Sequence, residues 1–162
     1  MGFIGGAVLV LALVLGTASR AMADGEADQA ELEFQLGADR YREGAYREAL
    51  LHFLSSNRLA RNRNVMFNVA RTYERIGRFP EAYRWYVDAA EGETDASVRA
   101  SIDEALARIT PRVSVLDVVT TPAGATLYLN RMDLGSIARS PRRIALEPGT
   151  YRVIAALEGY EE

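Results

Sequence analysis

Cysteine and lysine are absent from this chain, and histidine occurs once, as His52. Without cysteine the protein has no disulfide, no thiol nucleophile and no cysteine-bound zinc. A single histidine argues against a histidine-based metal site and against a catalytic triad. The sequence also contains no glycine-rich phosphate loop outside the first residues and no G-x-S-x-G elbow. We therefore expect no catalytic residue, no metal and no cofactor.

Charge is modest in amount and uneven in distribution. The formal net charge is −3, which does not suggest a nucleic-acid-binding protein. Residues 24–33 are acidic, whereas residues 35–90 carry ten arginines against six carboxylates. With 49% hydrophobic and 25% charged residues, the 162-residue chain has a globular composition and enough length for one ordinary domain or two small ones.

The long apolar run of the sequence is at the N-terminus. Residues 3–16 are apolar, and Ala21-Met22-Ala23 fits the A-x-A cleavage pattern. The run is short for a membrane span, so we interpret residues 1–23 as a signal peptide. A buried core helix or an uncleaved anchor is the alternative, and the region before the run lacks the usual basic residue. Export would place the protein in the periplasm or cell envelope.

Residues 30–110 contain a repeated helical pattern. Leu36-Gly37, Gly44, Tyr46, Ala49 and Phe53 recur 33 residues later as Val69-Ala70, Gly77, Phe79, Ala82 and Tyr86. Each unit is predicted to be two amphipathic helices with glycine at the turn, the first over 30–58 and the second over 63–91. A further apolar stripe predicts a helix from Asp95 to Thr110-Pro111 that covers the end of the array.

This spacing resembles the tetratricopeptide repeat, which places Leu-Gly, Tyr, Ala and Phe at set positions within about thirty-four residues. The second unit matches it well, whereas the first departs at Glu33 and Arg40, and neither unit has the terminal proline. The resemblance implies partner binding on the concave face, which the first helix of each hairpin lines. Aligned to that family, the groove residues are Phe34, Ala38, Tyr41, Arg42, Phe67, Asn68, Arg71, Glu74 and Arg75.

Two alternatives remain open for these positions. The arginines could pair with carboxylates of an acidic or C-terminal peptide, because guanidinium groups favour bidentate contact. They could equally be solvated side chains that Glu74 and nearby acids partly neutralise. Asn68 stands where the repeat family often has asparagine for structural reasons. His52 is expected to be a surface or partly buried side chain.

From Val113 onward the pattern becomes extended. Residues 113–119, 125–129 and 151–157 are rich in β-branched, aromatic and aliphatic side chains, and turn signals separate them at 121–124 and 147–149. In the last segment Tyr151, Val153, Ala155 and Leu157 alternate with Arg152 and Ile154. That alternation predicts a strand with one buried face.

Pro122-Ala123-Gly124-Ala125 resembles the tetrapeptide that names the PEGA domain, with alanine in place of its usual glutamate. Leu134-Gly135, Ser140-Pro141, Pro148-Gly149 and Gly159-Tyr160 agree with that family in spacing. The resemblance covers Arg112 to the end and implies a small antiparallel sandwich of a kind found in envelope and surface proteins. Asn130 and Arg131 stand where the family often has aspartate and glycine, so we expect a different turn there. The family normally continues beyond Glu162, so we also expect a truncated reading frame or fragment.

The expected fold is therefore α+β. A signal peptide (1–23) and an acidic segment (24–29) precede two tetratricopeptide-like hairpins with a capping helix (30–110) and an incomplete PEGA-like β-domain (111–162). We expect a non-catalytic scaffold of the bacterial cell envelope that binds a protein or peptide, with no nucleic acid or small-molecule cofactor, and that docks at an envelope surface. The alternative is the sensory or regulatory N-terminal part of a larger envelope protein.

Overall fold

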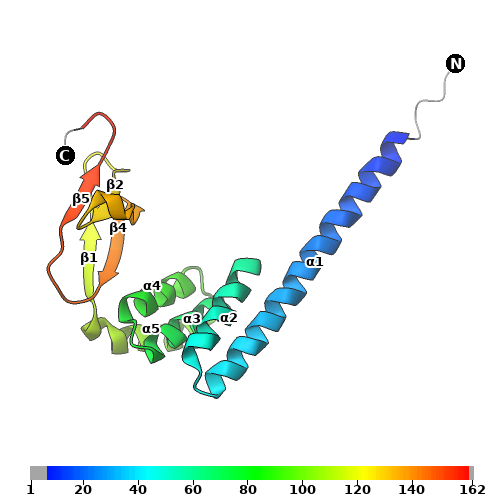
Figure 1. Ribbon diagram of the computed structural model, residues 1–162, viewed down its shortest axis with the longest axis horizontal. Helices are drawn as coiled ribbons and strands as arrows, with labels where there is room; N and C mark the ends of the chain where they lie inside the picture. The colour runs from blue at the N-terminus through cyan, green and yellow to red at the C-terminus, as the bar shows by residue number, and fades with distance from the viewer. Residues whose placement is uncertain (1–6, 161–162) are drawn as a thin grey trace. The chain divides into compact units, whose positions relative to one another are not determined.

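The computed structural model describes the backbone of residues 7–160 and the side chains of residues 25–160. The helices in this range are α1 (Ala7–Arg42), α2 (Tyr46–Leu59), α3 (Arg63–Arg75), α4 (Phe79–Ala90) and α5 (Ala96–Ile109). The strands are β1 (Ser114–Val118), β2 (Thr126–Leu129), β3 (Ala138–Arg139), β4 (Arg142–Leu146) and β5 (Val153–Ala156), with short 3₁₀ turns η1 (Thr110–Arg112) and η2 (Met132–Leu134). This order of helices followed by strands confirms the α+β fold (Figure 1). The chain divides into two compact units, residues 1–72 and 73–162.

In the first unit, α1 and α2 pack side by side as a hairpin (Figure 1). Gly37 of α1 is buried directly against the ring of Phe53, which is 1% exposed. A Cβ on Gly37 would lie 2.7 Å from Cδ1 of Phe53, so glycine is what allows the two helices this approach. Phe34 adds a second ring, whose centre is 5.7 Å from that of Phe53. A small residue of α1 thus packs closely against a large ring of α2.

The 33-residue repeat of the sequence is also a repeat of backbone conformation. Gly44 and Gly77 end the first helix of each hairpin with φ values of 80° and 78°, in the left-handed region that favours glycine. The following residues Ala45 and Arg78 donate backbone hydrogen bonds of 2.9 Å to carbonyls five residues earlier. Each turn therefore closes its helix in the same way.

The buried positions of the second helices repeat as well. Ala49 and Phe53 of α2 are 0% and 1% exposed, and Ala82 and Tyr86 of α4 are both 0% exposed. The same two positions in each unit therefore form the inner surface of the helix, as the pattern predicted. Tyr73 of α3 is half-buried.

Helix α1 begins earlier than the sequence pattern suggested. The first hairpin was expected to start near Ala30 after a separate acidic segment, whereas residues 24–29 lie inside a helix that runs unbroken from Ala7. These residues contain no proline, which would end or kink the helix. Residues 1–6 of the predicted signal peptide lie outside the described residues. Within the part of the chain that the structure describes, no helix is long and apolar enough to cross a membrane.

The predicted capping helix is α5, in the second unit. The Asp95 carboxylate caps it by accepting hydrogen bonds from the backbone N–H groups of Ser97 and Val98. Ile102, Ala105 and Ile109 are buried, and α5 packs on α4. The helix ends at Ile109, where η1 with Pro111 turns the chain into the β-region.

The strands form two small antiparallel sheets, one with the order β1-β4 and one with the order β3-β2-β5. Leu127 of the central strand β2 is fully buried. Three of the five strands in the described residues were predicted, whereas β3 and β4 were not. Strand β3 has two residues, and β4 begins with two arginines directly after Pro141, so neither has a strand pattern that can be recognised.

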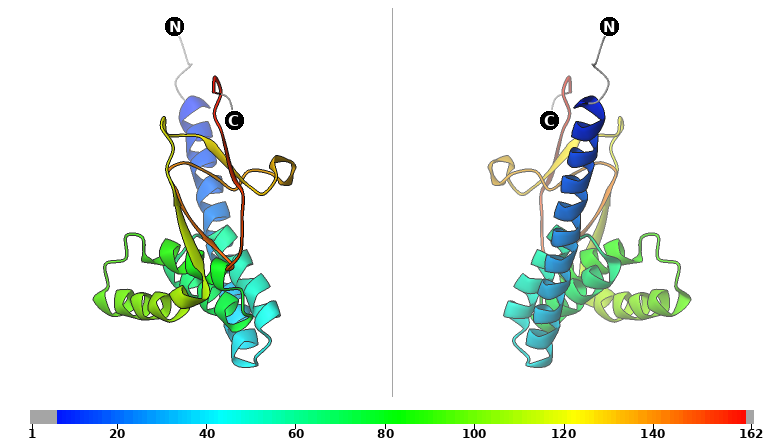
Figure 2. Two further views of the ribbon diagram at one scale, coloured as in Figure 1. Left: turned by 90° about the vertical axis from the view of Figure 1, so that its left-hand side faces the viewer. Right: turned by 90° about the vertical axis from the view of Figure 1, so that its right-hand side faces the viewer.

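Two details of the β-region concern its last strand and the turn after β2. In β5, Ala155 is exposed and Val153 and Ile154 are both half-buried, so the predicted alternation with one buried face is wrong. Strand β5 pairs only with β2, at the edge of a three-stranded sheet. A sheet of this size is too small to bury one face of the strand completely. The turn after β2 depends on Asn130, which has a φ of 64° and so takes a conformation that asparagine tolerates better than most residues. The β2–β3 connection extends away from the strands in both views of Figure 2.

Candidate functional site

Three of the predicted groove residues meet in the first unit. The guanidinium carbon of Arg71 lies 5.2 Å from the ring centre of Tyr41 and 5.8 Å from that of Phe67, both within the range of a cation–π contact. Tyr41 comes from α1, and Phe67 and Arg71 are one turn apart on α3. We call Tyr41, Phe67 and Arg71 the arginine–aromatic cluster.

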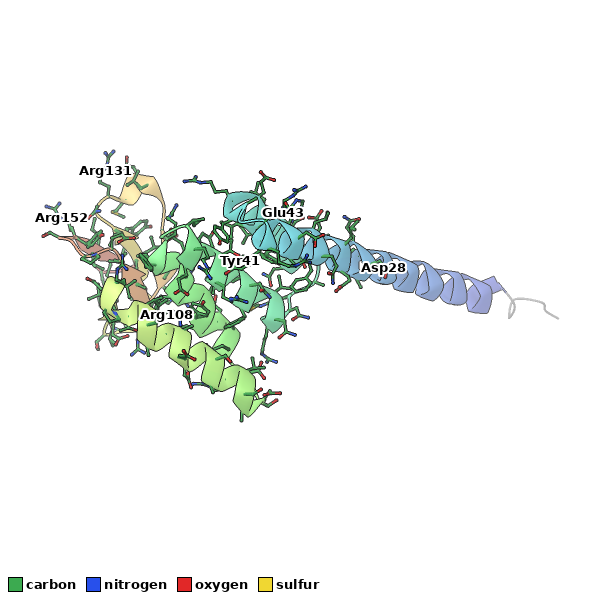
Figure 3. The ribbon with its side chains drawn as sticks, turned by 90° about the horizontal axis from the view of Figure 1, so that it is seen from below. Asp28, Tyr41, Glu43, Arg108, Arg131 and Arg152 are labelled. Carbon is green, nitrogen blue, oxygen red and sulfur yellow. The ribbon has the colours of Figure 1, made fainter. Side chains whose placement is uncertain are left out.

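The cluster is reachable from solvent. Arg71 is exposed, and Tyr41 and Phe67 are half-buried. Tyr41 also stacks edge-on against Tyr46 at the start of α2, with ring centres 5.2 Å apart (Tyr41 is labelled in Figure 3). Within the described residues Arg71 makes no ion pair, so its guanidinium group contacts aromatic rings rather than a carboxylate. Its N–H groups are available to an anion.

The other predicted residues of the first unit have more local roles. Phe34 packs on the core residue Phe53, and Ala38 is half-buried. Arg42 is exposed and pairs with Asp39 one turn earlier on the same helix. Surface pairs of this kind contribute little to stability and keep the arginine solvated. Phe34, Ala38 and Arg42 therefore lie on α1 but are not part of the arginine–aromatic cluster.

Asn68 bonds to its own helix. Its side-chain amide donates to the backbone carbonyl of Asn64 at 2.8 Å, and the backbone carbonyl of Asn68 accepts from the Thr72 hydroxyl at 2.6 Å. Thr72 is fully buried, so this second bond satisfies a buried polar group. Both hydrogen bonds are therefore made within α3.

Glu74 belongs to a polar network of the second unit. Its carboxylate accepts two hydrogen bonds from the Arg108 guanidinium, at 2.8 and 3.1 Å, and one from the Tyr86 hydroxyl at 2.9 Å. The hydrogen bond from Arg108 is the main cause that lowers the pKa of Glu74 below its ordinary value; partial burial opposes it, and Tyr86 and the charge of Arg75 assist. Glu74 therefore ties α3, α4 and α5 together and is not a free groove carboxylate.

Sequence reasoning missed this network because Glu74 and Arg108 are 34 residues apart. It also missed the hydrogen bonds that join two of the PEGA-like motifs, the 122–125 tetrapeptide and Ser140-Pro141. The Ser140 hydroxyl accepts from the backbone N–H of Ala125 at 3.0 Å, and it is hydrogen-bonded to the Thr120 hydroxyl. The 121–125 turn and the Ser140-Pro141 segment are thus held together at a buried polar group.

His52 is half-buried, and its Nδ1 lies 2.8 Å from the Glu33 carboxylate across the α1–α2 hairpin. This hydrogen bond links α1 to α2. Across residues that the structure describes, no three His, Cys, Asp or Glu side chains are grouped so that they could hold a metal ion.

The C-terminal part of the chain matches a known protein family. Residues 113–162 match the family model of the PEGA domain. No curated protein matches the sequence. The matched range starts one residue before β1 and contains both sheets and the Thr120–Ser140 tie. The chain therefore consists of paired helices followed, at its C-terminus, by a PEGA domain.

Proposed function

We propose that this protein is an exported, non-catalytic scaffold of the bacterial cell envelope, in which tetratricopeptide-like helices bind a partner. The repeat assignment is supported by the matched turns at Gly44 and Gly77 and by the matched burial of Ala49 with Ala82 and of Phe53 with Tyr86. Such agreement at a fixed 33-residue separation is what a duplicated helical hairpin produces.

The arginine–aromatic cluster is the observation that carries the binding proposal. An exposed arginine held over Tyr41 and Phe67 loses less freedom on binding than an unsupported one, because the rings already restrict its side chain. Its planar N–H groups match a carboxylate in a bidentate pair. The two half-buried rings add apolar contact area beside the charge. The partner is accordingly a protein or peptide with acidic groups.

The location rests on two separate observations. The apolar run at residues 3–16 with Ala21-Met22-Ala23 has the form of a signal peptide. The C-terminal match to the PEGA domain is the second, because the resemblance to that family implies an envelope or surface protein. In this proposal the helices hold the partner, and the β-domain docks or spaces the protein at an envelope surface.

The test is a cross-linking pull-down from envelope fractions with three tagged chains. The parent is compared with Arg71→Ala and with Arg47→Ala, which removes another exposed arginine of the first unit for which no ion pair is formed in the described residues. We expect one partner to be enriched with the parent and with Arg47→Ala and to be lost with Arg71→Ala.

The control arginine makes the result specific. Equal recovery with all three chains would overturn the role of the arginine–aromatic cluster. Equal loss with both variants would show that binding depends on general positive charge rather than on Arg71. Matching far-ultraviolet circular dichroism of the three chains would exclude loss of the helices as the cause.

A further inference from the structure

The β2–β3 loop, residues 130–137, exposes aliphatic side chains to solvent. Met132, Leu134 and Ile137 are 37%, 70% and 44% exposed. The loop contains η2 and extends away from the strands of the PEGA domain (Figure 2). Single exposed apolar residues are ordinary on protein surfaces, but three within six residues of one protruding loop form a local apolar surface.

The loop is anchored at both ends. The backbone N–H of Asn130 donates to the carbonyl of Arg152 at 2.7 Å, and its side-chain oxygen accepts from the backbone N–H of Arg152 at 3.0 Å. At the other end the N–H of Ile137 donates to the carbonyl of Leu127 at 2.8 Å. Inside the loop Gly135 closes η2 with a bond to Met132. The apolar side chains are therefore presented by a hydrogen-bonded turn at the edge of the sheet.

Arginines surround this apolar surface. Arg131 and Arg139 stand at the two ends of the loop, and Arg152 is bonded to its first residue. Arg131 pairs with Asp133, whereas Arg139 and Arg152 have no carboxylate partner among the described residues. Figure 3 shows the side chains of Arg131 and Arg152 pointing outward from the β-domain. Counting Asp133, the loop and its border carry two more positive than negative charges.

We propose that the β2–β3 loop docks on the surface of a membrane that contains anionic headgroups. Aliphatic side chains beside arginines fit the boundary between headgroups and acyl chains, where the apolar groups leave water and the guanidinium groups bind phosphate. Binding through so small a surface is weak and reversible. The inference rests on the proposed envelope location, but it does not involve the arginine–aromatic cluster.

The absence of cysteine allows a local test on the full chain. An environment-sensitive fluorophore is attached through Ser136→Cys in the loop or, as a control, through Ala107→Cys on α5; both positions are exposed. Each labelled protein is mixed with phosphatidylcholine vesicles with or without phosphatidylglycerol. We expect a blue shift and increased emission only for the loop label and only with phosphatidylglycerol. A probe in the loop also separates its insertion from any binding by the apolar N-terminal run.

Variants of exposed residues then test the two contributions. Arg152→Gln should weaken the vesicle response about fivefold, which corresponds to about 1 kcal/mol per arginine near an anionic surface. Leu134→Ser should weaken it about tenfold. Arg71→Ala should leave it unchanged, so that failure of the groove and failure of the loop remain distinct. Comparable thermal unfolding midpoints would show that the variants are folded.

Three results would overturn the proposal. The first is no response of the loop label to either vesicle, and the second is an equal response to both, which would remove the role of the headgroup charge. The third is a response of the loop label to envelope proteins without lipid but not to vesicles, which would make the loop a protein-binding surface instead.

Discussion

Gly37 of α1 lies so close to Phe53 of α2 that a Cβ on Gly37 would be 2.7 Å from Cδ1 and 2.8 Å from Cε1 of the ring. Real Cβ atoms do not approach a neighbour so closely, and the ring is 1% exposed, so it has little room to move. This contact sets the separation of the two helices.

Gly37→Ala is therefore expected to destabilise the protein. Overpacking a core costs about 1–3 kcal/mol, which outweighs the gain of about 1 kcal/mol from replacing glycine inside a helix. Urea unfolding followed by circular dichroism measures the net change. Gly25→Ala is the matched control, because a Cβ there has no neighbour within 4 Å; it should leave stability unchanged or slightly raised. An equally stable Gly37→Ala protein would contradict the packing of α1 on α2.

Gly44→Ala and Gly77→Ala test a different effect of glycine. A Cβ at either position would touch nothing within 4 Å, but both residues have φ near +80°. The cost is therefore confined to the backbone and should be about 1 kcal/mol at each site, with asparagine costing less than alanine. Chemical denaturation of the four single variants measures it. Unequal losses at the two glycines would argue against equivalent turns.

The Glu74–Arg108 pair predicts that the folded protein loses stability at acidic pH. Because the folded protein lowers the pKa of Glu74, its contribution is present above the ordinary value of 4.5 and is lost as the pH falls through the lower folded pKa. Glu74→Gln should cost on the order of 1–2 kcal/mol at pH 7 and less at about pH 3.

Unfolding free energies of the parent and Glu74→Gln at several pH values provide the measurement. Asp28→Asn serves as the control, since Asp28 is exposed and forms no ion pair within the described residues (Figure 3). A gap between parent and Glu74→Gln that stays constant down to pH 3 would exclude the pair as a source of the acid sensitivity.

The sequence predicted what depends on local periodicity and on turn chemistry. The helices, both glycine turns and the start of the last helix near Asp95 follow from patterns within one turn or one hairpin. Alignment to the repeat family selected Tyr41, Phe67 and Arg71, but their stacking depends on how α3 packs beside α1. The Glu74–Arg108 pair joins residues far apart along the chain, and β3 is too short to have a periodicity. Such features follow from tertiary packing, which no local pattern records.

The contact between Arg71 and Tyr41 can be tested without a partner by a double-mutant cycle. The cycle combines Arg71→Ala with Tyr41→Leu, and its coupling energy measures the cation–π contact alone. The contact of Tyr41 with Tyr46 cancels, because it is present whether position 71 is arginine or alanine. For an exposed pair we expect a coupling of about 0.5–1 kcal/mol in the free energy of unfolding.

The salt dependence of that coupling helps to identify its nature. A cation–π contact is a short-range attraction between a charge and a ring quadrupole, so the coupling should change less with ionic strength than that of a surface ion pair such as Arg99–Asp103. Cycles of both pairs at low and high sodium chloride make the comparison directly. A coupling near zero for Arg71 and Tyr41 would mean that the guanidinium is not held over the ring in solution. In that case the arginine–aromatic cluster would have no preorganised charge to offer a carboxylate.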